Sequence, residues 1–358
     1  MKKNLLTTIL GLSIAISISA QSGTDGNISW KIEGSTLTIS GTGDMPDYVN
    51  SQTAPWYNNY RETIKTVVIN DGVTSIGEDA FWNCDNLTTI TIPNSVKSIR
   101  DGAFDLCESL ISISIPNSVT SIGVGAFREC RSLTSITIPN SITSIGRSAF
   151  VYCALTSVVI PNGVESIEDG TFFGCDNLAT IIIPNSVTSI GERVFEGCSS
   201  LTSIIIPNSV TNIGWLAFSY CEALANIYSH RAYPPELERD VFDYENISTS
   251  TLHVPVGSKQ YYQAAEGWKE FYNIVEDATM DITAVTAQEN IGIYPNPVSD
   301  NFQLTGITNA TEITIFDTSG IAVINKVVTP NEAIFIDNLP TGVYFVQVGS
   351  KTMKLMKK

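Results

Sequence analysis

Apolar residues recur along this chain with a period of 23 residues. Between positions 69 and 228 the pattern L-x-x-I-x-I-P-x-S-V-x-x-I-x-x-x-A-F-x-x-C occurs seven times. A fixed period of this length indicates a repeat architecture, in which each unit buries its apolar side only against its neighbours. A single unit should therefore not fold alone. The phenylalanine slot is filled in every unit, by Phe81, Phe104, Phe127, Phe150, Phe172, Phe195 and Phe218.

Each unit predicts one short β-strand followed by a turn. Residues 133–138 are rich in β-branched side chains, alternate near their end and stop at Pro139. Pro139 and Asn140 predict a type II turn in which the asparagine takes the left-handed conformation. The predicted fold class is a repeat solenoid with a parallel β-sheet along one side.

Both ends of such a stack need caps, because an open end exposes apolar side chains and unpaired strand edges. Residues 21–68 predict an N-terminal cap with a hairpin around Gly34. Residues 229–276 predict a degenerate repeat and a C-terminal cap, with Phe242 in the phenylalanine slot. The spacing of Tyr261, Ala265 and Trp268 predicts a short amphipathic helix that closes this end.

The repeat pattern resembles the 23-residue leucine-rich repeats of BspA-like bacterial surface proteins. The resemblance covers all seven units and includes the N-terminal segment LTISGTGDM with Pro55, Trp56 and Tyr57. It implies a secreted or surface-exposed protein, and adhesion to host proteins or to other bacteria is known in the family. The family implies the fold, whereas a particular ligand does not follow from it.

Residues 1–20 indicate a secretory signal peptide. Lys2 and Lys3 precede an apolar run, and Ser19 and Ala20 follow it as small residues. The run is too short to cross about 30 Å of hydrocarbon as a helix, and no later stretch reaches the roughly 20 residues required. We therefore expect an exported protein without a transmembrane segment.

The last part of the chain differs in character from the repeats. Residues 277–290 lack aromatic side chains and predict a linker, and residues 291–358 hold short alternating runs that predict a small all-β sandwich. This domain resembles the type A C-terminal sorting domain of the type IX secretion pathway. The resemblance implies handling by the type IX machinery, passage across the outer membrane and an extracellular or surface-attached product. Its motif residues are Tyr294, Pro295, Asn296, Pro297, Gly342, Tyr344 and Lys354.

Charge and motif content argue against nucleic acid binding and against catalysis. The 36 acidic and 20 basic residues give a formal net charge of -16, which repels phosphate backbones. The two histidines, His230 and His253, have no neighbouring residues that would complete a metal site. The sequence contains no G-x-S-x-G, H-E-x-x-H, phosphate-loop or EF-hand motif. We expect no catalytic residue, metal or cofactor, and hence not an enzyme.

Seven cysteines in an exported protein suggest disulfides, but their spacing argues otherwise. They fall once per repeat at 84, 107, 130, 153, 175, 198 and 221, so all occupy the same inward slot. Strands of neighbouring repeats at about 5 Å would hold their Cβ atoms beyond the roughly 3.5–4.5 Å that a disulfide prefers. We predict a ladder of buried free thiols.

The predicted binding site is one column on the open side of the sheet. The middle residue of each strand should point outward, and in the last four units this residue is apolar or aromatic. At about 4.8 Å per strand these four residues would form one apolar stripe for a protein ligand, on a host matrix or another cell surface. A glycan-binding module that uses Trp82 and Trp215, whose indoles could stack on sugars, is the alternative. A structural surface protein without a specific ligand is the third hypothesis. The stripe residues are Val159, Ile182, Ile205 and Tyr228.

Overall fold

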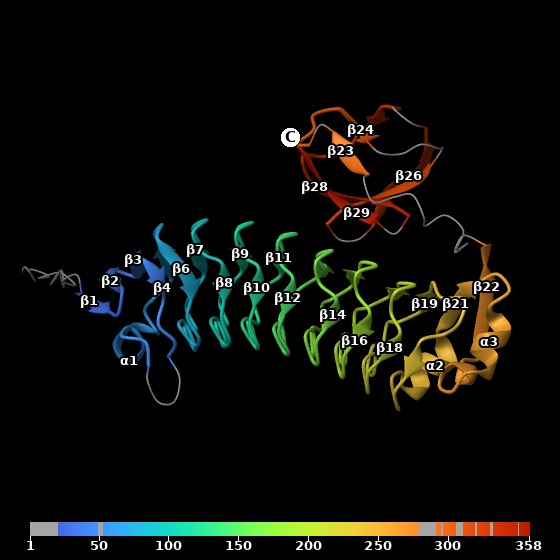
Figure 1. Cartoon of the computed structure of the whole chain (residues 1–358), viewed down its shortest axis with the longest axis horizontal. Helices are drawn as coiled ribbons and strands as arrows, with labels where there is room; N and C mark the ends of the chain where they lie inside the picture. Colours follow the sequence, from blue (N-terminus) through green and yellow to red (C-terminus); the bar gives the residue numbers. More distant parts are fainter. Residues whose placement is uncertain are drawn as a thin grey trace, which may run out of the picture.

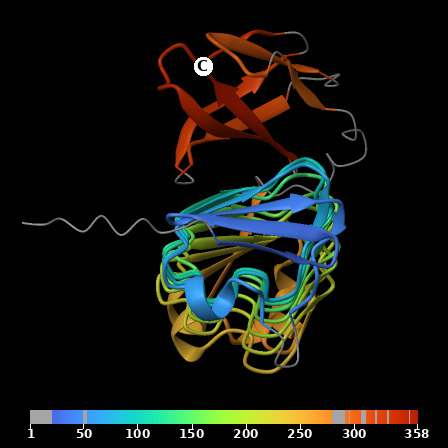
Figure 2. The same ribbon diagram turned by 90° about the vertical axis from the view of Figure 1, so that its left-hand side faces the viewer.

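The chain consists of a coiled solenoid followed by a small β-sandwich (Figure 1). The computed structural model describes residues 21–48, 53–278, 291–294, 296–305, 311–318, 321–329, 332–349 and 351–358. The predicted signal peptide and most of the predicted linker lie outside the described residues. The predicted fold class is confirmed. Seen end-on, successive coils of the solenoid superimpose closely (Figure 2).

One side of the coil, which we call the long-strand face, carries the predicted strands. They pair in parallel with equivalent residues opposite one another, as in Ile136 opposite Ile113. The strands are β5 (Thr66–Ile69), β7 (Thr89–Thr91), β9 (Ser112–Ser114), β11 (Ser135–Thr137), β13 (Ser157–Val159), β15 (Thr180–Ile182), β17 (Ser203–Ile206), β19 (Asn226–Ser229), β21 (Thr251–Pro255) and β22 (Asn273–Asp277).

A second parallel ladder, the short-strand face, was not predicted from the sequence. Its strands are mostly two residues long, too short for an alternating pattern to reveal them. Serine pairs with serine and isoleucine with isoleucine between neighbouring repeats. The strands are β4 (Gly43–Asp44), β6 (Val73–Ile76), β8 (Ser98–Ile99), β10 (Ser121–Ile122), β12 (Ser144–Ile145), β14 (Ser166–Ile167), β16 (Ser189–Ile190), β18 (Asn212–Ile213) and β20 (Glu236–Leu237).

The rest of each coil is a stack of turns that also bond from repeat to repeat. Such turns place non-glycine residues at positive φ, as at Leu106 with φ 61°, a conformation that costs roughly 1–2 kcal/mol for a residue with a Cβ atom. Bonding of every second amide to the next coil offsets this cost. In one repeat the amides of Gly102, Phe104 and Leu106 donate to the carbonyls of Val124, Ala126 and Arg128, each at 2.8 Å.

The proline–asparagine turn differs from the predicted one. The Ile142 amide donates to the Pro139 carbonyl at 3.0 Å, so Pro139 is the first residue of the turn rather than the second. Asn140 does not have positive φ. The prediction of a left-handed asparagine was wrong because the proline ends the strand and the turn begins on its own carbonyl.

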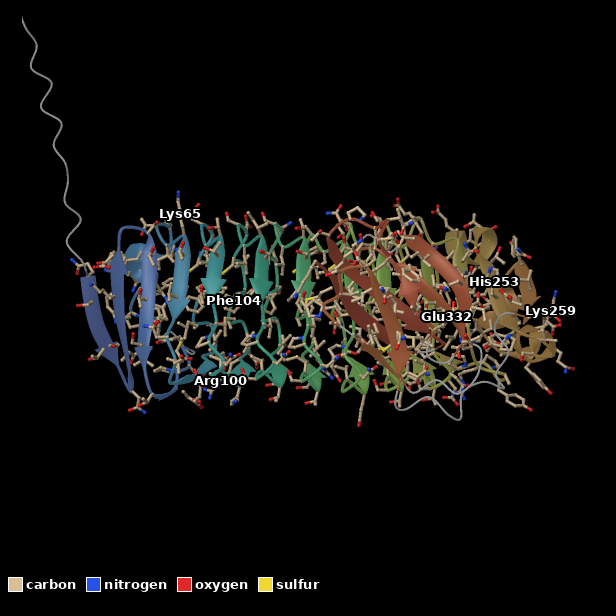
Figure 3. The ribbon with its side chains drawn as sticks, turned by 90° about the horizontal axis from the view of Figure 1, so that it is seen from above. Lys65, Arg100, Phe104, His253, Lys259 and Glu332 are labelled. Carbon is tan, nitrogen blue, oxygen red and sulfur yellow. The ribbon has the colours of Figure 1, made fainter. Side chains whose placement is uncertain are left out.

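The core of the solenoid is a continuous stack of aromatic rings. Neighbouring phenylalanines from Phe81 to Phe242 lie 5.2–5.8 Å apart between ring centroids, with interplanar angles of at most 18°. Trp56 stacks on Phe81 at one end, and Trp268 packs against Phe242 at the other. In the view from above, Phe104 lies between Lys65 and Arg100 at opposite edges of the coil (Figure 3).

The seven cysteines form the predicted ladder of free, buried thiols. From the second repeat onward, each thiol donates to the carbonyl of the phenylalanine in the preceding repeat, as Cys130 Sγ does to the Phe104 carbonyl at 3.2 Å. Burial raises the pKa of all seven thiols, to about 12 for Cys84 and Cys175. The cysteines therefore join repeats through a hydrogen bond rather than a covalent bond.

The N-terminal end is closed by the predicted hairpin. Strand β2 (Ile28–Glu33) pairs with β3 (Thr36–Gly41), and β1 (Gln21–Asp25) adds on the outside. Helix α1 (Tyr57–Tyr60) follows Trp56, whose indole N–H donates to the Ala80 carbonyl at 2.8 Å.

The C-terminal end is closed by short helices rather than by one amphipathic helix. Helix α2 (Tyr244–Thr249) precedes β21, and α3 (Lys259–Ala264) is separated from a 3-10 turn, η1 (Trp268–Glu270), by Gly267 with φ 76°. Within α3, Tyr262 rather than Tyr261 is buried. The predicted continuous helix was wrong because α3 ends at Ala264 and Ala265 is extended, before Gly267.

The C-terminal domain has the predicted sandwich form and a core separate from that of the solenoid. One sheet has the order β23-β24-β27 and the other β26-β25-β28-β29. The strands are β23 (Gly292–Tyr294), β24 (Asn301–Thr305), β25 (Thr311–Phe316), β26 (Ala322–Val328), β27 (Ile334–Phe335), β28 (Gly342–Val348) and β29 (Lys351–Lys357).

The aromatic stack predicts that a substitution inside the coil lowers the free energy of unfolding far more than a substitution on its outside. Phe150 is fully buried between Phe127 and Phe172, so Phe150→Ala should lower the free energy of unfolding by about 3–5 kcal/mol. Thr137→Ala, on the exposed face, should change it little. Chemical denaturation measures both variants, and small, equal losses would contradict the stack as the source of stability.

The thiol ladder predicts a loss of stability at alkaline pH. Between about pH 8.5 and 12 the unfolded chain loses thiol protons while the folded chain keeps them, so the free energy of unfolding falls by up to about 1.4 kcal/mol per pH unit for each thiol. Cys130→Ala should reduce this slope, whereas Val158→Ala, another buried truncation, should not. Urea titrations at pH 8, 9 and 10 measure the slopes, and equal slopes in the wild type and Cys130→Ala would refute the prediction.

Candidate functional site

The four predicted stripe residues lie side by side on the outside of the long-strand face. Val159 is opposite Ile182 in the strand register, and Ile205 is opposite Tyr228. Their sequence neighbours on β13, β15, β17 and β19 are buried, whereas the side chain of Ile205 is 39% exposed and the other three are half-buried. We call this set the apolar stripe. The side chains on it thus point away from the core.

The same face changes character along the array. In the earlier repeats the equivalent positions are exposed hydroxyl residues, Thr91, Ser114 and Thr137. Beside the apolar stripe runs a second outward column of small polar residues. No outward residue of β13, β15, β17 or β19 is charged: they are Ser157, Val159, Thr180, Ile182, Ser203, Ile205, Asn226 and Tyr228.

The outward column extends beyond the four predicted residues. His253 is opposite Tyr228 in the register and stacks on it, with ring centroids 4.3 Å apart. Its Nε2 lies 3.1 Å from Asn226 Oδ1, and its Nδ1 lies 3.5 Å from Asp277 Oδ2. His253 was not among the predicted stripe residues, although its place before Val254 and Pro255 matches the outward slot of an I-x-I-P strand.

The two predicted tryptophan contacts already pack against neighbouring side chains. Trp82 is half-buried and stacks on Tyr57, with centroids 5.2 Å apart and an interplanar angle of 10°. The ring of Trp215 lies 5.4 Å from the Arg193 guanidinium of the preceding repeat and 5.3 Å from that of Arg239 in the following one. A sugar could stack on Trp215 only by displacing an arginine.

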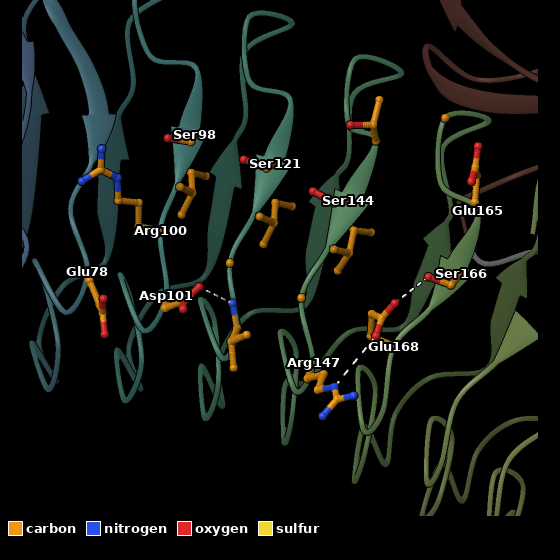
Figure 4. Close-up of a pocket in the computed structure, with 18 residues that line it drawn as sticks. Glu78, Ser98, Arg100, Asp101, Ser121, Ser144, Arg147, Glu165, Ser166 and Glu168 are labelled. Atoms are coloured by element: carbon orange, nitrogen blue, oxygen red, sulfur yellow. Dashed lines mark hydrogen bonds and ion pairs between the residues drawn. The ribbon is translucent and has the colours of Figure 1, made fainter.

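A shallow groove runs along the short-strand face (Figure 4). Its floor carries the serine ladder Ser98, Ser121 and Ser144 in register. The charged groups at its edge bond to the protein itself: Asp101 accepts the Val124 amide at 2.7 Å, and Arg147 lies 3.4 Å from Asp169.

One carboxyl group at the edge of this groove has a shifted pKa. Partial burial raises the pKa of Glu78, and the nearby carboxylates of Asp101, Asp79 and Asp47 raise it further. Across the described residues, no three His, Cys, Asp or Glu side chains are placed to hold a metal ion. The groove therefore carries a local excess of acidic groups.

The sorting-motif residues occupy different places in the sandwich. Tyr294 ends β23, Pro295 lies outside the described residues, and Asn296 and Pro297 are exposed. Tyr344 is buried on β28, and its hydroxyl donates to the Pro340 carbonyl at 2.8 Å. Gly342 and Lys354 lie on the paired strands β28 and β29, opposite Lys357 and Phe345. The first and last motifs meet, because Asn296 hydrogen-bonds to β29.

Within the part of the chain that the structure describes, no helix has the length and apolar character needed to cross a membrane.

Comparison with known families assigns both parts of the chain. Residues 56–166 and 143–263 match the family described as BspA type leucine rich repeat region, in 6 copies that span more than half of the chain. Residues 292–358 match the family described as secretion system C-terminal sorting domain. The chain matches no curated protein.

Solved structures similar to this chain are bacterial leucine-rich repeat proteins. A T. pallidum leucine rich repeat protein is 30% identical, with 51% of this chain and 91% of that chain covered and a TM-score of 0.40. A leucine-rich repeat protein from Eubacterium ventriosum is 27% identical, with 66% and 78% covered and a TM-score of 0.40. A leucine rich cell surface protein from Faecalibacterium prausnitzii is 25% identical, with 74% and 97% covered and a TM-score of 0.37.

Proposed function

The chain belongs to the family of BspA-type leucine-rich repeat proteins, and we propose that it binds another protein through the apolar stripe, as an adhesion or interaction protein. Its sorting domain directs it through type IX secretion to the cell surface or the extracellular space. The expected partner is a protein of a host matrix or of another cell surface.

The observation that carries the proposal is an uncharged, partly apolar surface on a strongly acidic array. Residues 21–290 contain 31 acidic and 13 basic residues, yet the outward positions of β13, β15, β17 and β19 hold no charge. Contiguous exposed apolar groups on soluble proteins mark interaction sites. The stripe is also held rigid by strand pairing, so little conformational entropy is lost when a partner binds.

The aromatic contacts favour a protein partner over a glycan. Sugar-binding sites commonly use an open indole face, and both candidate indoles are already stacked, Trp82 on Tyr57 and Trp215 between two arginines. Glycan binding and a structural role without a specific ligand are therefore the outcomes against which the proposal is tested. Binding rather than catalysis also agrees with the lack of a catalytic motif in the sequence.

A charge placed in the stripe should weaken binding without unfolding the protein. Ile182→Asp and Ile205→Asp should keep near-wild-type denaturation midpoints, because the free side chain stays in water, but should weaken capture at least tenfold because a buried, unpaired carboxylate is costly. The assay measures binding of residues 21–358 to a panel of purified extracellular-matrix proteins and to a glycan array.

Thr91→Asp, on the hydroxyl part of the same face, is the matched control and should weaken capture less. Unfolding of the two isoleucine variants would show that these side chains support the core. Wild-type binding by both variants would exclude the stripe as the site. Selective binding to glycans would favour the alternative function.

Removal of the C-terminal domain should separate folding from export. The two domains have separate cores, so a chain that ends at residue 278 should keep the circular dichroism and unfolding midpoint of the solenoid. In a host with type IX secretion this chain should remain in the periplasm, as cell fractionation would show. A truncated chain that still reaches the surface would refute the role of residues 291–358 in sorting.

A further inference from the structure

A side chain joins the beginning of the sorting domain to its last strand. The Asn296 side-chain amide donates from Nδ2 to the Lys354 carbonyl at 2.6 Å, and its Oδ1 accepts the Met356 N–H at 2.9 Å. These partners are 58 and 60 residues away along the chain. One asparagine thus bonds to β29 with a donor and an acceptor, as the backbone of a neighbouring strand would.

The backbone next to Asn296 continues the same pairing. The Val298 N–H donates to the Met356 carbonyl, and the Lys358 N–H donates to the Val298 carbonyl, both at 2.8 Å. Strand β29 is an edge strand of its sheet, paired on one side with β28. Asn296 and Val298 occupy part of its other side, where the backbone groups of an edge strand would otherwise lack partners within the fold.

We call the hydrogen bonds from Asn296 and Val298 to β29 the clasp. The clasp leaves alternate side chains of β29 free. The Asn296 side chain hydrogen-bonds to main-chain atoms of Lys354 and Met356; the Lys354 side chain is exposed, and that of Met356 is 39% exposed. Leu355 between them is fully buried. The Lys357 side chain donates to the carbonyls of Ile336 and Asp337 and is therefore engaged within the domain.

We infer that Asn296 is a positioning residue of the export signal, and that the signal is a folded surface rather than a linear tail. The clasp fixes β29 so that Lys354 and Met356 face outward together. A cation beside an exposed thioether fits a partner surface that combines carboxylates with an apolar contact. This partner surface belongs to the secretion machinery.

The test separates positioning from recognition by measuring two quantities on the full chain. The first is hydrogen exchange of the β29 amides in the purified protein, and the second is the fraction of the chain outside the cell in a host with type IX secretion. Asn296→Ala should raise the exchange rate of the Met356 amide by on the order of tenfold, because this amide loses its acceptor, and should reduce export. Asn296→Asp keeps an acceptor for the Met356 amide, so the exchange rate of that amide should rise less than in Asn296→Ala, although the carboxylate loses the donor to the Lys354 carbonyl and repels that oxygen.

Lys354→Glu should reduce export while leaving exchange of the β29 amides unchanged, because the clasp does not use that side chain. Asn325→Ala, at an exposed asparagine of β26, is the matched control and should change neither quantity. Lost export with normal amide exchange in Asn296→Ala would make Asn296 a contact of the machinery and overturn the positioning role. Normal export of Asn296→Ala despite rapid amide exchange would overturn the proposal that the export signal is a folded surface. Normal export of Lys354→Glu would overturn it as well.

Discussion

The solenoid depends on one constraint, which is that every repeat must place its phenylalanine ring against the ring of the next repeat. The ring centroids lie 5.2–5.8 Å apart, close to the spacing of paired strands, so ring stacking and strand pairing demand the same translation. The cysteine thiol reinforces it by donating to the phenylalanine carbonyl of the repeat before it. The ends of the stack are closed by two tryptophans, Trp56 and Trp268, which also satisfy their indole N–H groups on main-chain carbonyls.

The same translation creates the outward columns of the long-strand face, which include the proposed binding surface. Because equivalent residues of successive repeats lie in register, an outward position that the core does not use becomes a straight column along the array. The residues of that column are hydroxyl-bearing in the early repeats and apolar or aromatic in the later repeats. Tyr228 and His253 show that the column continues into the degenerate repeat, where the core pattern has already decayed.

Export and binding are assigned to separately folded parts of the chain. The sandwich has its own core, and its signal at β29 is held by Asn296 and Lys357 within the same domain. A hydrogen bond joins the two parts, from Ser157 Oγ on β13 to the Thr318 carbonyl at 2.9 Å.

The sequence by itself determined the features that recur in every repeat: the period, the phenylalanine stack, the free thiols and the outward phase of the long strands. A position that holds the same type of residue in seven repeats can be assigned to the core or to the surface from the sequence. Tertiary structure decided the contacts between unlike positions. The two-residue strands of the short-strand face form only through pairing with neighbouring coils, and Trp215 is enclosed by arginines from two different repeats. Asn296 meets β29 across 58 residues of sequence. Such contacts depend on distances in space, which no local pattern of side chains encodes.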